Sequence, residues 1–201
     1  MMKAIYLRLI GLLVATTFSV NVFAAQVCDA SVAQTTPVSS FQGSASGSEI
    51  FVSDNFTGLM WKQCVQGLSG SDCTTGTALS YTWQMALQAV ATVNTDPAET
   101  YHDWRLPNIK ELASIVEMQC HSPAANLTVF PATPLVANYN SADPQQITVY
   151  DSLLWSSTPS SIYNTAAPST GRALAWGVNF IDGGIVRADK SSSGFVRLVR
   201  N

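Results

Sequence analysis

The chain alternates between short hydrophobic runs and longer polar stretches, and the spacing within the runs predicts its elements. Hydrophobic positions at helical spacing predict a first helix over residues 83–93. Its start has an N-cap residue, Thr82. We expect Trp83, Leu87 and Val90 to share the buried face of this helix.

A second helix is predicted to begin after Asn108, because that residue is a preferred N-cap and Glu111 follows three positions later. This spacing defines a capping box. Pro107, directly before the cap, keeps the helix from starting earlier. The residues that would form its hydrophobic stripe are Leu112, Ile115 and Val116.

An extended segment precedes this helix, since Trp104 and Leu106 alternate with Arg105. For Arg105 and Glu111 we favour a buried ion pair beside the cap over a binding role. The predicted structural hub of the domain comprises Trp61, Trp104, Arg105, Pro107, Asn108, Glu111 and Arg197.

Strand-like runs occupy both ends of the domain. Residues 50–52 and 58–61 predict a hairpin across the turn at 53–57. A buried strand at 153–157 and a meander of strands at 173–180, 185–187 and 194–200 complete the set. In the last strand neither face is purely apolar, which predicts a central position with Arg197 satisfied internally.

Polar segments separate these elements. Residues 25–48 read as a Ser/Thr-rich N-terminal arm, either a linker or loosely packed, before a domain over 49–201. Residues 121–150 hold four prolines and predict a long irregular surface excursion, a type of loop that often binds ligands. The loop residues expected to meet a ligand are Tyr139, Tyr150 and Tyr163.

Residues 1–24 predict a signal peptide, because Lys3 and Arg8 precede an apolar run over residues 9–15 and Val22-Phe23-Ala24 fits the small-residue cleavage rule. The run is too short and too interrupted for a membrane span, so we expect none in the mature chain. Cleavage leaves eight basic and thirteen acidic residues, a net charge of −5. Without a basic cluster, a nucleic-acid partner is disfavoured.

The chain has four cysteines, and in an exported protein an even number indicates two disulfides. Three connectivities are possible. The Gly/Ser-rich loop between Cys64 and Cys73 favours that pair, which leaves Cys28 with Cys120. Zinc binding is disfavoured because the cysteine spacings do not match zinc sites.

Catalytic signatures are missing from the sequence. His102 and His121 are the only imidazoles, and no Gly-x-Ser-x-Gly elbow is present. Asp54 and Asp182 lie in turn sequences, where side-chain to backbone hydrogen bonds suffice without calcium. We therefore expect no enzymatic activity, no cofactor and no metal. For the five tryptophans we favour core packing over stacking on sugars.

Five ordered anchors resemble the C-terminal domain of the Legionella collagen-like adhesin family. They cover about residues 50 to 201 and comprise Asp54-x-x-Thr57-Gly58-Leu59-Met60-Trp61, Trp83-x-x-Ala86-Leu87, Asp103-Trp104-Arg105-Leu106-Pro107-Asn108-x-x-Glu111-Leu112, Trp155-Ser156-Ser157-Thr158 and Val196-Arg197-Leu198-Val199-Arg200. More distantly, the chain is similar to the superfamily of formylglycine-generating enzymes and C-type lectins. The second resemblance implies an α+β, C-type-lectin-like or sulfatase-modifying-factor-like fold, with two helices on twisted, mostly antiparallel strands and long loops.

The first resemblance implies an adhesin-type recognition module. Its namesake is associated with sulfated glycosaminoglycans and trimeric assembly, but this chain has no collagen-like repeat and an acidic balance that disfavours a polysulfated ligand. Formylglycine-generating chemistry requires a late cysteine pair, and no cysteine follows Cys120. We expect a periplasmic, cell-surface or secreted module that binds a glycan or a surface protein and can form a trimer. A structural subunit of a surface appendage or envelope assembly is the alternative, and a degenerate enzyme is a third.

Overall fold

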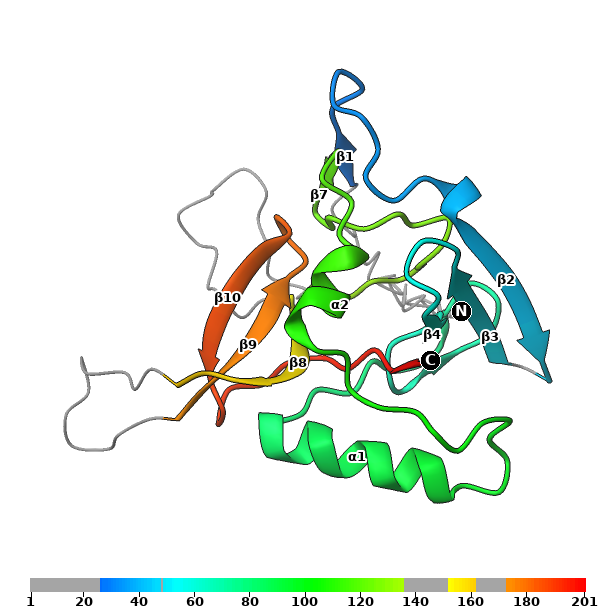
Figure 1. Ribbon diagram of the computed structural model, residues 1–201, viewed down its shortest axis with the longest axis vertical. Helices are drawn as coiled ribbons and strands as arrows, with labels where there is room; N and C mark the ends of the chain where they lie inside the picture. The colour runs from blue at the N-terminus through cyan, green and yellow to red at the C-terminus, as the bar shows by residue number, and fades with distance from the viewer. Residues whose placement is uncertain (1–25, 48, 136–151, 162–172) are drawn as a thin grey trace, which may run out of the picture.

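The computed structural model describes residues 26–47, 49–135, 152–161 and 173–201, which form an α+β fold of small antiparallel sheets with two α-helices (Figure 1). The elements in the first half are β1 (Val27–Cys28), the 3-10 helix η1 (Val38–Ser40), β2 (Phe41–Ser46), β3 (Glu49–Asp54), β4 (Met60–Lys62), β5 (Leu68–Ser69), β6 (Thr75–Gly76) and α1 (Trp83–Thr95). Those in the second half are α2 (Ile109–Ser114), β7 (Cys120–His121), β8 (Leu153–Pro159), β9 (Leu174–Asn179), β10 (Gly184–Asp189) and β11 (Val199–Arg200). No helix in these ranges has the length and apolar character needed to cross a bilayer.

Two sheets carry most of the strands, with orders β11-β4-β3-β2 and β10-β9-β8. They lie on opposite sides of α2, and α1 runs along the lower edge of the view in Figure 1. The predicted β3–β4 hairpin is confirmed. Its turn is closed by Asp54, whose carboxylate accepts hydrogen bonds from Phe56 N (2.9 Å) and Thr57 Oγ1 (2.7 Å). Asp182 accepts from Gly184 N at 2.9 Å in the same way, so both aspartates stabilise turns, as interpreted from the sequence.

The expectation of a linker or loosely packed arm is wrong for residues 41–46. They form β2, which pairs antiparallel with all of β3 from Phe41 opposite Asp54 to Ser46 opposite Glu49. Most side chains of this edge strand are exposed, so its sequence lacks the hydrophobic alternation that identifies a strand. Backbone pairing, which does not depend on side-chain type, extends the sheet across the expected boundary at residue 48.

Helix α1 begins where predicted, and Thr82 Oγ1 accepts a hydrogen bond from Met85 N at 3.3 Å. Its buried face differs in part from the prediction. Ala86 is fully buried, whereas Leu87 is 38% exposed. Trp83 and Val90 pack against the cluster of Phe51, Trp104 and Trp155 as predicted, so only Leu87 departs from the expected face. Trp83 also donates from Nε1 to Ser156 O of β8 at 2.8 Å.

Helix α2 confirms the predicted capping box. Asn108 Oδ1 accepts from Glu111 N at 3.0 Å, and Glu111 Oε2 accepts from Asn108 N at 2.7 Å. Arg105 forms a bidentate pair with Glu111, at 2.7 and 2.9 Å. The Arg105 side chain is 37% exposed, so the ion pair lies at the surface and not in the interior as expected. The predicted stripe is buried, although the helix is short and ends before two of its members, Ile115 and Val116.

The C-terminal segment packs between two hydrophobic clusters, but β11 lies at the end of the strand order β11-β4-β3-β2, so it is an edge strand of that sheet and not a central one as expected. Phe195 and Val199 pack in one cluster, while Val196 and Leu198 pack in the other. Regular pairing is limited to β11 and to single bridges with Leu154 and Arg105, so the predicted strand is shorter than expected.

Three of the five tryptophans, Trp61, Trp104 and Trp155, have 1% or less of their surface exposed, in agreement with the core interpretation. The other two are half-buried beneath cations. Lys190 Nζ lies 4.0 Å from the ring centroid of Trp83, and the Arg187 guanidinium carbon lies 5.5 Å from that of Trp176.

Candidate functional site

A large concave feature of the described residues is an apolar groove of about 730 Å³. This volume lies within the range of about 300–1,000 Å³ that is common for ligand sites. One wall comes from residues 68–78 and the other from residues 123–135. The principal hydrophobic side chains that line it are Leu68, Ala78, Leu127, Pro134, Leu135 and Phe195.

The first wall is a compact loop closed by the predicted disulfide between Cys64 and Cys73, which is confirmed. Strand β5 lies inside this loop and pairs with β6, which directly follows Cys73 and Thr74. The backbone segments at residues 67 and 76–77 approach each other closely, and two glycines with positive φ, Gly67 and Gly76, allow this approach. A Cβ atom on Gly67 would lie 2.2 Å from Thr77 O, and one on Gly76 would lie 2.3 Å from Gly67 O. The wall therefore depends on glycine at both positions.

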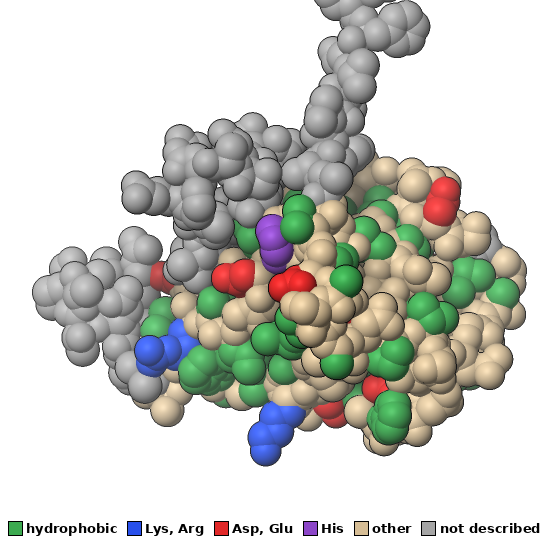
Figure 2. All heavy atoms as spheres, turned by 90° about the horizontal axis from the view of Figure 1, so that it is seen from above, with side chains coloured by type: hydrophobic (Ala, Val, Ile, Leu, Met, Phe, Trp, Pro, Cys, Tyr) green, Lys and Arg blue, Asp and Glu red, His purple; other side chains and the backbone are tan. Residues whose placement is uncertain are grey.

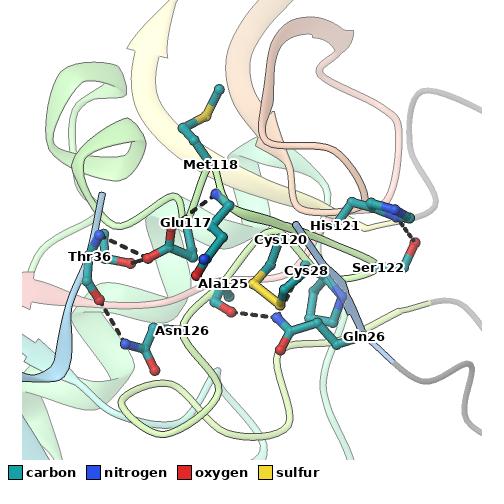
Figure 3. The surroundings of a disulfide bond; sticks show 12 residues. Gln26, Cys28, Thr36, Glu117, Met118, Cys120, His121, Ser122, Ala125 and Asn126 are labelled. Atoms are coloured by element: carbon teal, nitrogen blue, oxygen red, sulfur yellow. Dashed lines mark hydrogen bonds between the residues drawn. A yellow bond between two sulfur atoms is a disulfide. The ribbon is translucent and has the colours of Figure 1, made fainter. Parts of the chain in front are cut away.

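The second wall is attached to the N-terminal segment by the other predicted disulfide, Cys28–Cys120, which is also confirmed. Figure 3 shows Gln26 beside this bond. Gln26 Nε2 donates to Pro123 O at 2.7 Å and to Ala125 O at 2.6 Å, and Gln26 itself lines the groove. Each wall is thus held by its own disulfide, which limits how far the groove can deform.

Glu117 joins the same segments through a buried carboxylate (Figure 3). Its oxygens accept hydrogen bonds from the backbone N–H groups of Thr35, Thr36 and Gln119 at 3.0, 2.9 and 3.0 Å, and from Thr36 Oγ1 at 2.8 Å. Burial acts to raise the pKa of Glu117, but these hydrogen bonds outweigh it and lower the pKa. Asn126 Nδ2 adds a hydrogen bond to Thr36 O at 2.7 Å.

The structure corrects the prediction of a surface excursion for the start of residues 121–150. Ala124, Ala125 and Phe130 are almost completely buried, and the segment forms the second groove wall. Proline and small residues concealed this role, because they lack a periodic pattern. The three tyrosines expected to meet a ligand, Tyr139, Tyr150 and Tyr163, lie outside the described residues.

Arg197 supports the groove from the interior, where it is 1% exposed. It donates from Nη2 to Thr133 Oγ1 at 3.1 Å and from Nη1 to Gln63 O, and its guanidinium lies 4.5 Å from the ring centroid of Phe130. Burial lowers the pKa of Arg197 to about 9. Thr133 lines the groove, so its hydrogen bond with Arg197 fixes part of the second wall. The predicted internal satisfaction of Arg197 is confirmed only in part, because its Nε is buried without a hydrogen-bond partner.

The sequence model of the Lcl C-terminal domain matches residues 50–200. The chain belongs to this family. The predicted resemblance to the Legionella collagen-like adhesin domain is therefore confirmed. No curated protein matches the chain.

The Lcl C-terminal domain match starts at Ile50, although the fold begins earlier. Strand β2, the partner cysteine Cys28 and the groove residue Gln26 all precede the matched range. One disulfide of this family member therefore ties a segment outside the family match to a wall of the groove.

No ionisable side chain of the described part of this Lcl C-terminal domain lines the groove. Among the described residues, no group of three His, Cys, Asp or Glu side chains is arranged to hold a metal ion. His102 Nδ1 lies 3.0 Å from Asn94 O, and His121 Nδ1 lies 3.2 Å from Ser122 Oγ. On the face shown in Figure 2, charged side chains of both signs are sparse and separated. The lining that the described residues give the groove is therefore mostly apolar.

Proposed function

We propose that this chain is an exported, non-enzymatic recognition or adhesion module that binds its partner in the apolar groove. The observation that supports this most strongly is the pair of groove walls, each held by a disulfide. A rigid site loses little conformational entropy when it binds, so modest apolar contact can give useful affinity. Membership of an adhesin domain family points to the same class of function.

The lining favours the apolar side chains of a surface protein over a glycan. Sugars present many hydroxyl groups that require hydrogen-bonding partners, whereas Leu68, Leu127, Leu135 and Phe195 offer none from their side chains. A glycan remains the second candidate ligand. It would bind through the loop tyrosines, which the structure does not describe.

Export is part of the proposal. The signal-like residues 1–24 would direct the chain to the periplasm, the cell surface or the medium. Two disulfides are stable in those oxidising compartments. We further propose that the two helices and antiparallel sheets belong to the C-type-lectin-like class of α+β folds.

A structural subunit of a surface appendage or envelope assembly is the second class, and a trimer is the assembly that the family resemblance suggests. Sedimentation of the mature chain separates these possibilities, because a subunit would form defined assemblies by itself or with an isolated envelope component. A degenerate enzyme, the third class, would require turnover of a substrate by the purified chain.

The decisive experiment compares the mature chain on an array of short apolar peptides and on a glycan array. Leu127→Asp places a charge in the groove, and Leu87→Asp is the matched control on the exposed side of α1. We expect saturable peptide binding that falls at least tenfold in Leu127→Asp and persists in Leu87→Asp. Binding to glycans alone, or peptide binding that Leu127→Asp leaves intact, would contradict the groove proposal.

A further inference from the structure

Lys62 joins two carboxylates, one from β3 and one from the segment that follows α1. Its Nζ donates to Glu49 Oε1 at 2.7 Å and to Glu99 Oε1. The side chains are largely buried, with 8% of Lys62, 11% of Glu99 and 32% of Glu49 exposed. One cation therefore faces two groups that are anionic when ionised, and the fully ionised cluster carries one excess negative charge.

The second oxygen of each carboxylate has no hydrogen-bond donor. Glu49 Oε2 and Glu99 Oε2 are both buried without a partner. A buried acceptor without a donor is costly, and a proton placed between two carboxyl groups satisfies both oxygens at once. Burial raises the pKa of Glu99, and the neighbouring carboxylate of Glu49 raises it further, against the opposing effect of Lys62.

Neighbouring charged groups do not provide the missing donor. The small cavity of about 100 Å³ beside the cluster has Glu49, Lys62 and Glu99 as its only titratable lining groups, since Cys64 is in a disulfide. The nearby Arg200 forms an ion pair with Asp103, with 2.6 Å between Arg200 Nε and Asp103 Oδ1. Asp96, before Glu99 in the chain, accepts from Ala98 N at 2.9 Å.

The cluster fastens a loop to the sheet. Glu49 lies on β3 and Lys62 on β4, while Glu99 belongs to the segment of residues 96–101 that joins α1 to the hub around Trp104. Besides the ion pair, a hydrogen bond of 2.8 Å from Thr100 Oγ1 to Ser46 Oγ holds this segment to the end of β2. Tyr101 also packs edge-on against Phe51 of β3.

We propose that Glu49 and Glu99 share one proton above Lys62 and that this proton makes the attachment of residues 96–101 dependent on pH. With the proton present, both Oε1 atoms accept from Lys62, one Oε2 carries the proton and the other Oε2 accepts it in a hydrogen bond. The cluster of one ammonium, one carboxylate and one carboxylic acid is then neutral. When the proton leaves, two buried carboxylates repel each other and the segment is held less firmly. The cluster would therefore hold residues 96–101 to the sheet more firmly at acidic pH.

The direction follows from linkage. A carboxyl group whose pKa is higher in the folded chain than in the unfolded chain stabilises the fold. This stabilisation is fully present below the unfolded-state pKa. This contribution is lost as the pH rises through the folded-state pKa. Local opening of residues 96–101 should therefore increase with pH beyond the intrinsic pH dependence of amide exchange.

The test is a titration of the glutamate side-chain carbons by NMR in the mature chain, with Glu99 assigned by its loss in Glu99→Gln. We expect Glu99 to titrate above the ordinary glutamate range and to move down in Glu49→Gln, which removes the like charge and the proton acceptor. Glu111→Gln, at the α2 cap, is the control and should leave the Glu99 midpoint unchanged.

Hydrogen exchange supplies the second readout. Protection of the Glu99 amide, which donates to Asp96 O at 3.1 Å, should fall with rising pH in the wild-type chain but stay level in Glu99→Gln. The proposal is overturned if Glu99 titrates at or below the ordinary range, if Glu49→Gln does not move it, or if protection is independent of pH.

Discussion

Two buried acidic sites in this domain are built in opposite ways. Glu117 has no cation beside it and is surrounded by backbone N–H groups from Thr35, Thr36 and Gln119. Glu99 shares the cation Lys62 with a second carboxylate, Glu49. The pKa of Glu117 is lowered, whereas the pKa of Glu99 is raised.

The difference shows that the number of donors around a carboxylate, more than a formal ion pair, decides its protonation. Four N–H and O–H donors compensate the burial of one charge at Glu117. The single ammonium of Lys62, shared by two carboxylates, does not compensate the burial of Glu99. The two sites should consequently stabilise the fold at opposite ends of the pH range.

The largest effect is expected where the N-terminal segment is cross-linked. Replacing both Cys28 and Cys120 with serine removes a disulfide that spans 92 residues. The chain-entropy estimate for such a loop is about 4–5 kcal/mol of unfolding free energy. Urea unfolding followed by tryptophan fluorescence measures the loss. A loss below about 1 kcal/mol would show that the Glu117 hydrogen bonds hold this segment without the disulfide.

Glu117→Gln should have the next largest effect, about 2–3 kcal/mol, because the amide retains one acceptor oxygen and turns an NH2 group toward existing donors. The same urea experiment measures it. The loss should also shrink at acidic pH, since the lowered pKa gives Glu117 a contribution that disappears as the pH falls through its folded-state pKa. An unchanged loss at low pH would contradict the assigned role of its charge.

Glu111 is an intermediate case, because it has both a cation and a backbone donor. Burial acts to raise its pKa, but hydrogen bonds from Arg105 and from Asn108 N lower it overall. Glu111→Gln should cost about 1 kcal/mol, the usual size for a cap with a partly exposed ion pair. Thermal unfolding at low and high salt checks this. A loss that vanishes at high salt would assign the effect to Arg105 alone.

Glu99→Gln should have the smallest effect on stability, of the order of 1 kcal/mol or less near neutral pH. The direction of its pH dependence distinguishes Glu99→Gln from Glu117→Gln. Because the glutamine amide mimics the protonated acid, the variant should lose the decline in stability that the wild-type chain shows as the pH rises through the Glu99 pKa. Melting temperatures over a pH series compare the two profiles.

Local elements were predictable where one short stretch contains both partners. The capping box of Asn108 and Glu111 and the β3–β4 hairpin depend on residues a few positions apart, and both are confirmed. The alternation around Arg197 correctly indicated a segment buried on both sides. The Cys64–Cys73 pairing followed from the composition of one loop.

Other features escaped prediction for physical reasons. Strand β2 is held by backbone hydrogen bonds, and its Ser, Gly and Ala side chains leave no pattern. The exposed position of Leu87 results from how α1 meets β8, which helical periodicity alone does not specify. The groove wall formed by residues 123–135 mixes three prolines and several small residues with large apolar ones at no regular spacing, so in sequence it resembles a surface loop.

The sequence by itself determined the family, the caps and turns, the paired cysteines and the buried arginine, because each depends on residue types at short or fixed spacing. Only the tertiary structure decided which carboxylate is surrounded by N–H donors, which pair must share a cation and where the groove opens. These depend on segments such as Thr35–Thr36 and Glu117 that lie some eighty residues apart and meet only in the fold. The electrostatic and apolar environment of a residue depends on such tertiary contacts, so the sequence of either segment alone does not reveal it.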